Sequence, residues 1–167
     1  MNDTQTLAFE LRLDELRLRQ RGCEDHDLAG CLLAACSAHD PSPEKQLAVI
    51  EYLIDSGVSI NETDKNGVTP LHRAVRFRSL EAVDLLLANG ADVHATDRKS
   101  QSTALHRAVT NSGAPATAGK TDVAASIVRS LLSHGADPTA KNKKGKSPTD
   151  YRISNELLAA FNQKDGD

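Results

Sequence analysis

The chain has 167 residues, of which 3% are aromatic and none is Trp, and its formal net charge is -3. This length allows one domain with a substantial core, which must be built from Leu, Val, Ile and Ala. No apolar run approaches the roughly 18 residues that a membrane-spanning helix needs, so we expect a soluble, cytoplasmic protein that is not exported.

The first predicted element is a helix within residues 5–21, QTLAFELRLDELRLRQR. Leu7, Leu11 and Leu18 would share one side of this helix, although the alternation of apolar and polar residues through Leu13 would also suit a strand. We favour a helix that packs over the following segment and place a helical N-terminal cap at residues 1–27. A dimerisation or partner-binding helix is the alternative.

Three cysteines and two histidines follow within a short stretch: Cys23, His26, Cys31, Cys36 and His39. The gaps between Cys23 and His26, and between Cys36 and His39, are ones that zinc ligands use, so a zinc site is one alternative function. However, Cys31 and Cys36 lie in the apolar stretch CLLAAC, where small thiols fill helix interfaces. An odd number of cysteines near one end also argues against a disulfide framework. We therefore expect reduced thiols, no metal and no cofactor.

Residues 64–96 predict two short helices. DKNG at 64–67 is typical of a turn, because Asn and Gly tolerate positive φ. Thr69 can cap a helix that begins at Pro70 and runs to about residue 77. Ser79 suits the start of a second helix, which Gly90 would end as a left-handed residue.

The same signals recur along the chain. TPLHRAV at 69–75 is followed 34 residues later by TALHRAV at 103–109, and LLLANGAD at 85–92 is echoed by LLSHGAD at 131–137. The second spacing is longer because NSGAPATAGKT, at 111–121, is inserted between two predicted helices, so the underlying period is about 33 residues. Such short helices bury too little apolar surface to fold alone, so the units must stack.

These units resemble the ankyrin repeat family, whose pattern is D-x-x-G-x-T-P-L-H-x-A, a helix pair and then L-L-x-x-G-A-D. The matching residues of the second unit are Asp64, Gly67, Thr69, Pro70, Leu71, His72, Ala74, Leu86, Leu87, Gly90, Ala91 and Asp92. The resemblance implies an all-α solenoid of stacked helix-turn-helix units with hairpin loops. We expect about three repeats plus capping elements.

The resemblance also divides the chain. Repeat 1 (28–63) is divergent, with GCLLAAC in place of T-P-L-H, and repeat 2 (64–96) is close to the family pattern. Repeat 3 (97–141) has Ala104 in place of Pro, lacks the turn Gly and carries the insertion at 111–121, which we interpret as a tolerated surface loop rather than a contact loop. Residues 142–167 resemble a C-terminal capping repeat and tail, because the end of a stack faces water.

The histidine of the repeated heptapeptide could act as a general base beside its threonine. However, no third group is placed by spacing to orient it, and catalytic residues are not typically copied one repeat apart. The resemblance implies instead that His72 and His106 bond the threonine of their own unit and the backbone of the next one. No phosphate-binding loop, dinucleotide-binding motif or nucleophile elbow is present, so we predict no enzymatic activity and no catalytic residues.

Function must then come from positions that the repeat framework leaves free. In the ankyrin family, the hairpin tips and the exposed side of each first helix line a concave surface that binds other proteins. By position, the resemblance assigns to this surface Lys65, Asn66, Val68, Arg73, Arg76, Phe77, Arg98, Lys99, Ser102, Arg107, Thr110, Asn111, Lys143, Lys144, Lys146 and Tyr151.

Many of these residues are basic. Residues 61–167 hold 15 Lys and Arg against 12 Asp and Glu, whereas residues 1–60 hold 5 against 11. Stacking would bring Arg73 and Arg107 close together on a positive face, with Phe77 as a candidate aromatic anchor. We expect a monomer that binds a protein with an acidic or mixed-charge segment. Nucleic-acid binding through the same face is the alternative, which the acidic chain and the few aromatics disfavour.

Overall fold

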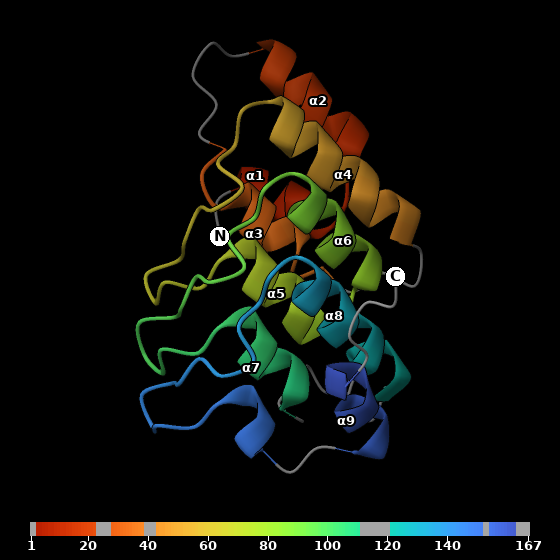
Figure 1. The fold of residues 1–167 in the computed structure, drawn as a ribbon. Helices are drawn as coiled ribbons and strands as arrows, with labels where there is room; N and C mark the ends of the chain where they lie inside the picture. Colours follow the sequence, from red (N-terminus) through yellow and green to blue (C-terminus); the bar gives the residue numbers. More distant parts are fainter. Residues whose placement is uncertain (1–2, 23–27, 39–42, 111–120, 152–153, 163–167) are drawn as a thin grey trace.

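The computed structural model describes residues 3–22, 28–38, 43–110, 121–151 and 154–162 (Figure 1). Its helices in chain order are α1 (Asp3–Phe9), α2 (Leu13–Gly22), α3 (Cys31–Ala35), α4 (Pro43–Asp55), α5 (Pro70–Phe77), α6 (Leu80–Ala88), α7 (Ala104–Val109), α8 (Thr121–Ser133), the 3-10 helix η2 (Pro148–Asp150) and α9 (Asn155–Asn162). These ranges contain no β-strand, which confirms the predicted all-α fold. None of these helices is long and apolar enough to cross a membrane.

The helices form two parallel columns. α1, α3, α5, α7 and η2 make up an inner column, in which each element contacts the next, and α2, α4, α6, α8 and α9 make up an outer column. Each of the first four inner helices also packs against the outer helix that follows it in the chain. The hairpins between successive layers project from the inner column and stack along one side of the molecule (Figure 1). This arrangement is the predicted solenoid of stacked helix pairs.

The N-terminal segment differs from the prediction, because it forms two helices instead of one. The chain reverses at Leu11, whose φ of 56° is left-handed, and the amide of Arg12 bonds to the carbonyl of Leu7 at 2.9 Å. The reversal allows Leu7, Leu11 and Leu16 to be buried together, which a single straight helix would not permit. α1 lies on α3, and α2 on α4, so the pair adds one more layer to the stack.

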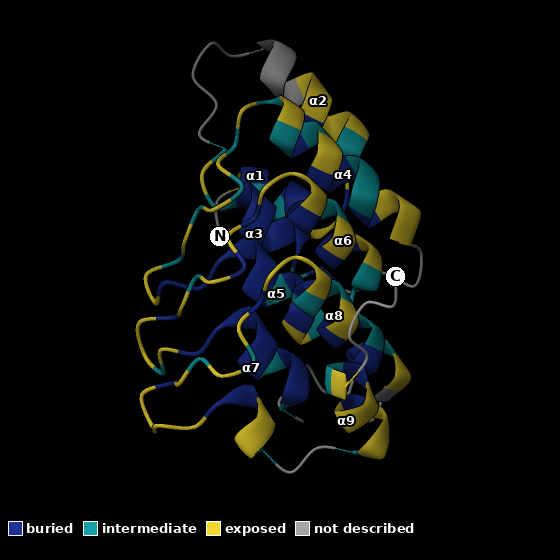
Figure 2. Ribbon diagram, in the orientation of Figure 1, coloured by how far each residue is buried: buried dark blue, intermediate teal, exposed yellow. Residues whose placement is uncertain are grey.

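Aliphatic side chains fill the space between the columns, as the composition predicts. Ile50, Leu71, Leu86, Leu105 and Ile127 are fully buried, and they come from successive layers. In Figure 2 the buried residues gather along the inner column and on the facing sides of the outer helices, while the hairpin tips are exposed. The apolar residues of the repeats are therefore buried between the two columns, and the hairpin tips and one side of the inner helices remain exposed to solvent.

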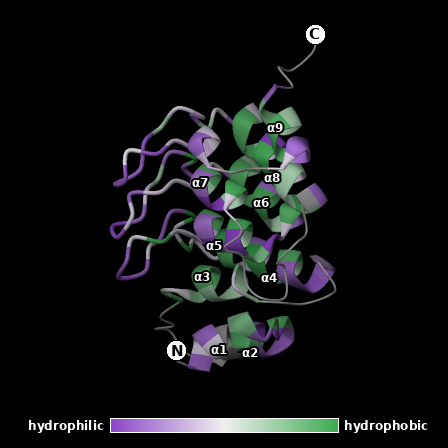
Figure 3. Cartoon of the chain, turned by 90° about the horizontal axis from the view of Figure 1, so that it is seen from below, coloured by the Kyte–Doolittle hydropathy of each residue, from purple (hydrophilic) through white to green (hydrophobic). Residues whose placement is uncertain are grey.

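Adjacent hairpins are held together by their backbones. The amide of Arg98 donates to the carbonyl of Asn66 at 2.8 Å, and the amide of Lys143 donates to the carbonyl of Ser100 at 2.9 Å. Figure 3 shows these hydrophilic hairpins extending away from the hydrophobic helices. The contacts fix the spacing of side chains that belong to different repeats.

Candidate functional site

Both copies of the repeated heptapeptide begin their helices with the same hydrogen bonds. Thr69 Oγ1 accepts from the amide of His72 at 3.3 Å, and His72 Nδ1 accepts from the amide of Thr69 at 3.3 Å. Thr103 and His106 repeat these contacts at 3.4 and 3.2 Å. This reciprocal capping satisfies amides at the start of α5 and α7 that would otherwise lack partners.

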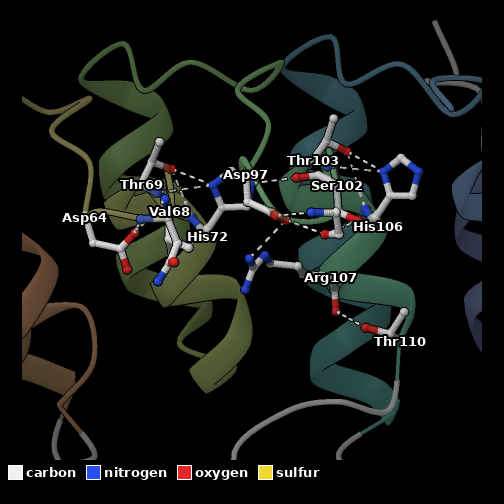
Figure 4. Close-up of polar contacts among 12 residues, drawn as sticks. Asp64, Val68, Thr69, His72, Asp97, Ser102, Thr103, His106, Arg107 and Thr110 are labelled. Carbon is white, nitrogen blue, oxygen red and sulfur yellow. Dashed lines mark hydrogen bonds and ion pairs between the residues drawn. The ribbon is translucent and has the colours of Figure 1, made fainter. Parts of the chain in front are cut away.

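The other ring nitrogen of each histidine reaches the next repeat. Because Nδ1 accepts a hydrogen bond, the proton lies on Nε2. Nε2 of His72 donates to the carbonyl of Ser102 at 3.0 Å (Figure 4). Nε2 of His106 donates to the carbonyl of Lys146, also at 3.0 Å. Burial, together with the nearby charge of Arg107, lowers the pKa of His72 to about 4, so this ring is neutral. The contacts confirm the structural role predicted for both histidines.

A second repeated contact joins each inner helix to its own hairpin. Arg73 Nη2 lies 2.9 Å from Asp64 Oδ2, and Arg107 Nη2 lies 3.2 Å from Asp97 Oδ2. Two of the arginines predicted to bind a partner therefore have their charges balanced within the protein.

The carboxylates of these pairs also hold the turns of the hairpins. Asp64 Oδ1 accepts from the amides of Asn66 and Val68 at 2.8 and 3.0 Å. Burial of Asp97 disfavours its ionised form, but hydrogen bonds from Ser100 and the charge of Arg107 outweigh this effect and lower the pKa of Asp97. Both carboxylates thus belong to the framework that shapes the hairpins.

The hairpins and inner helices form a groove in two adjoining parts, which we name the inner groove. Its N-terminal part has a volume of about 290 Å³ and lies over α5 and the hairpins of repeats 2 and 3. Its C-terminal part has a volume of about 450 Å³ and lies over α7 and the hairpins at 97–102 and 142–147. Lys99, Ser100 and Arg107 line both parts.

Most of the residues predicted to bind a partner line this groove. They are Asn66, Val68, Arg73, Arg76, Lys99, Ser102, Arg107, Thr110, Lys143, Lys144 and Tyr151. Residues from repeats 2 and 3 and from the segment at 142–151 are brought together here, as stacking implies.

The remaining predicted residues lie elsewhere. Lys65 and Arg98 are exposed on their hairpins, and Phe77 is half-buried at the end of α5 and lines neither part. Lys146 is exposed, with its Nζ 5.6 Å from the centre of the Tyr151 ring. Asn111, like residues 112–120 of the insertion that it begins, lies outside the described residues, whereas Thr121 begins α8. Tyr151 thus lines the groove, whereas Phe77, the predicted aromatic anchor, does not.

Sequence reasoning missed the role of Arg78. Its Nη1 and Nη2 donate to the carbonyls of Ala108 and Thr110 at 2.8 and 3.0 Å, so it caps the end of α7 from the previous repeat. Burial lowers its pKa. The available signal was an arginine at the helix joint where the family has glycine, but the sequence does not show what its side chain contacts.

The cysteine and histidine cluster is only partly described. Cys31 and Cys36 are fully buried at α3, and burial raises the pKa of the Cys36 thiol. Cys23, His26 and His39 lie outside the described residues. Within the described part of the chain, no three potential ligands lie close enough to hold a metal ion.

Comparison with known proteins gives one consistent result. The family model described as ankyrin repeats (3 copies) matches residues 32–142. The chain is 38% identical over 102 residues to an ankyrin repeat protein of fowlpox virus, an alignment that covers 60% of this chain and 27% of the viral protein. It is 31% identical over 116 residues to mouse Rabankyrin-5, covering 70% of this chain and 10% of that protein.

The fold is also similar to a solved structure. The crystal structure of the ankyrin repeat domain of Bcl-3 superposes with a TM-score of 0.75 at 25% identity, covering 95% of this chain and 66% of that one. The mouse homologue of B-cell lymphoma 3 protein is 34% identical over 113 residues, which cover 68% of this chain and 22% of that protein. The chain therefore spans less than a third of the length of these curated relatives.

Proposed function

The chain belongs to the ankyrin repeat family, and we propose on that basis that it is a non-enzymatic module that binds a partner protein in the inner groove. Ankyrin repeats are generally protein–protein interaction modules, and the fold is typically a binding scaffold without catalysis. The partner, in this proposal, presents an acidic or mixed-charge segment to the hairpins and inner helices.

The observation that carries the proposal is the groove itself, lined by residues from repeats 2 and 3 and from the segment at 142–151. Backbone hydrogen bonds between hairpins, and the histidine contacts between repeats, hold its walls in place before any partner arrives. A partner would therefore bear little of the entropic cost of ordering this surface, which favours binding.

Charge supports an acidic partner. Arg76, Lys99, Lys143 and Lys144 are exposed on the groove, and none forms an ion pair with a described residue. Unpaired positive charge on a concave surface attracts an acidic segment and speeds its association. Arg73 and Arg107 support the walls through Asp64 and Asp97 instead.

The test compares charge reversal inside and outside the groove. A partner is first isolated with the wild-type chain by affinity capture and identified by mass spectrometry, and its affinity is then measured by calorimetry. Arg76→Glu/Lys144→Glu, with one reversal in each part of the groove, should weaken binding by about tenfold or more.

The matched control is Lys45→Glu/Arg129→Glu, which reverses two exposed cations on the outer helices α4 and α8. Its affinity should stay within about twofold of the wild type, since rim and distant charges contribute little. If both variants weaken the binding of the partner equally, or if neither variant weakens it, the binding surface lies elsewhere.

A further inference from the structure

The two parts of the inner groove differ in how their charges are balanced. In the N-terminal part, two of the four lining cations, Arg73 and Arg107, are paired with the lining carboxylates Asp64 and Asp97. In the C-terminal part, Lys99, Lys143 and Lys144 are exposed, no carboxylate lines the wall, and these lysines form no ion pair within the described residues. Among the described residues, the C-terminal part therefore has three unpaired cations and no carboxylate, whereas the N-terminal part has two, Arg76 and the shared Lys99, beside two carboxylates.

Two hairpins bring these three lysines together. The amide of Lys143 bonds to Ser100, the residue after Lys99, and Asn142 Oδ1 accepts from the amide of Lys144 at 2.9 Å. The backbone thus holds like charges near one another with no counter-charge from the wall. Such an arrangement raises the electrostatic energy of the free protein, and a bound anion would lower it.

An aromatic ring lies beside the lysines. The hydroxyl of Tyr151 accepts from Asn142 Nδ2 at 2.7 Å, and its ring meets the ring of His106 edge-on, with centroids 6.4 Å apart. Tyr151 is half-buried and lines the same part of the groove. A fixed aromatic ring next to cations is a composition typical of residues that dominate binding energy.

We propose that the C-terminal part of the inner groove binds a partner segment in which an Asp or Glu side chain lies next to an apolar one. The carboxylate is held by Lys99, Lys143 and Lys144, and the apolar side chain packs on Tyr151. This inference rests on the proposed function. It adds that the C-terminal end of the groove binds the acidic residue of the partner and that an apolar residue lies next to that acidic residue.

A library of random linear peptides on phage tests the proposal with the full chain as bait. It is selected in parallel on the wild type, on Lys143→Glu/Lys144→Glu, and on Lys65→Glu/Arg76→Glu, which carries the same change of charge at the N-terminal end. The wild type and the N-terminal variant should enrich peptides with Asp or Glu beside Leu, Ile, Phe or Trp. The C-terminal variant should lose this enrichment.

One selected peptide is then synthesised and its affinity measured by fluorescence anisotropy. Lys143→Glu/Lys144→Glu should weaken binding by about tenfold or more, and by at least about threefold more than Lys65→Glu/Arg76→Glu does. Replacing the apolar residue of the peptide by Ser should weaken binding to the wild type by about tenfold, a comparison that leaves the fold of the chain unaltered.

The outcomes separate this inference from the proposed function. Selected peptides without acidic residues, or an equal loss in both variants, would overturn the inference and leave a peptide-binding groove in place. Selection of no peptide, or binding that neither variant alters, would overturn the inference and remove support for the groove as the binding surface.

Discussion

Arg78 and Gln101 both hold a left-handed backbone, with φ of 59° and 51°, which costs a residue with a side chain about 1 kcal/mol. Arg78 offsets this cost through its two hydrogen bonds to the end of α7. Gln101 stands in the turn where repeat 3 lacks the glycine of its neighbours, and its exposed side chain makes no hydrogen bond within the described residues. The same backbone conformation thus has a different consequence at each position.

Substituting glycine at the two positions should shift stability in opposite directions. Gln101→Gly should raise the free energy of unfolding by up to about 1 kcal/mol, because glycine adopts this φ without strain. Arg78→Gly should lower it by about 1 kcal/mol, because two charge-assisted hydrogen bonds are lost. Urea denaturation measures both, and a shift of the same sign in the two variants would contradict this account.

His72 should make stability sensitive to acid. Its folded pKa of about 4 lies below its ordinary value of 6.5, so the unfolded chain binds a proton that the folded chain does not as pH falls between these values. Its contribution is therefore fully present above pH 6.5 and is lost as pH falls towards 4.

Between pH 7.5 and pH 5, the free energy of unfolding should fall by about 2 kcal/mol through His72 alone. Urea denaturation at the two pH values measures the fall in the wild type and in His72→Gln, which keeps a polar side chain that does not titrate. The fall should be smaller in the variant; an equal fall in both proteins would show that other groups cause it.

Among the helices, α3 differs from α5 and α7 in which group accepts hydrogen bonds from the amides at its N-terminus. Its N-cap is Gly30, which has no side chain to offer, and α3 belongs to the repeat without the T-P-L-H motif. The carboxylate of Glu62, from the hairpin that leads to α5, accepts from the amides of Gly30 and Leu33 at 2.8 and 3.0 Å. The missing cap is thus supplied by the next hairpin, and a negative charge there also suits the helix dipole.

Removing this cap should destabilise the protein and loosen α3. Glu62→Ala should lower the free energy of unfolding by about 1–2 kcal/mol, and Glu62→Gln by less, because an amide oxygen can still accept. Urea denaturation measures both. Glu51→Ala, at an exposed site on α4, is the control and should change little. If Glu62→Ala costs no more than the control, Glu62 is not the cap of α3.

At the scale of the whole molecule, stability should vary along the stack. α5, α6, α7 and α8 have layers packed on both sides, whereas α2 and α9 lie in the outermost layers of the described structure. In a repeat protein, stability comes largely from interfaces between neighbouring units, so end layers open more readily.

Native-state hydrogen exchange followed by NMR should therefore show the slowest amides in α5 to α8 and faster exchange in α2 and α9. Protection should decrease towards both ends. Uniform protection from α2 to α9 would mean that the whole stack opens as one unit.

Much of this fold could be predicted from short-range signals. The helix predicted from Pro70 to about residue 77 is α5, because its cap, its proline and its apolar side are all local features. The reversal at Leu11 could not be predicted in the same way, because no glycine or proline marks it and it depends on burying Leu7 and Leu16 against α3 and α4. The sequence also allowed Asp64 to be interpreted as a turn residue, and the turn does use its carboxylate.

The sequence by itself determined the repeat and its period, and its resemblance to the ankyrin repeat family implied the structural use of Thr69, His72, Thr103 and His106, because each acts on its own unit or on the next one. Only the tertiary structure decided which charges in the groove stay unpaired. In the sequence, Arg73 and Lys99 are both simply basic residues. In the structure, Arg73 forms an ion pair with Asp64, whereas Lys99 forms none with a described residue. Charge balance depends on distances between side chains from different hairpins and helices, and those distances exist only once the layers are stacked.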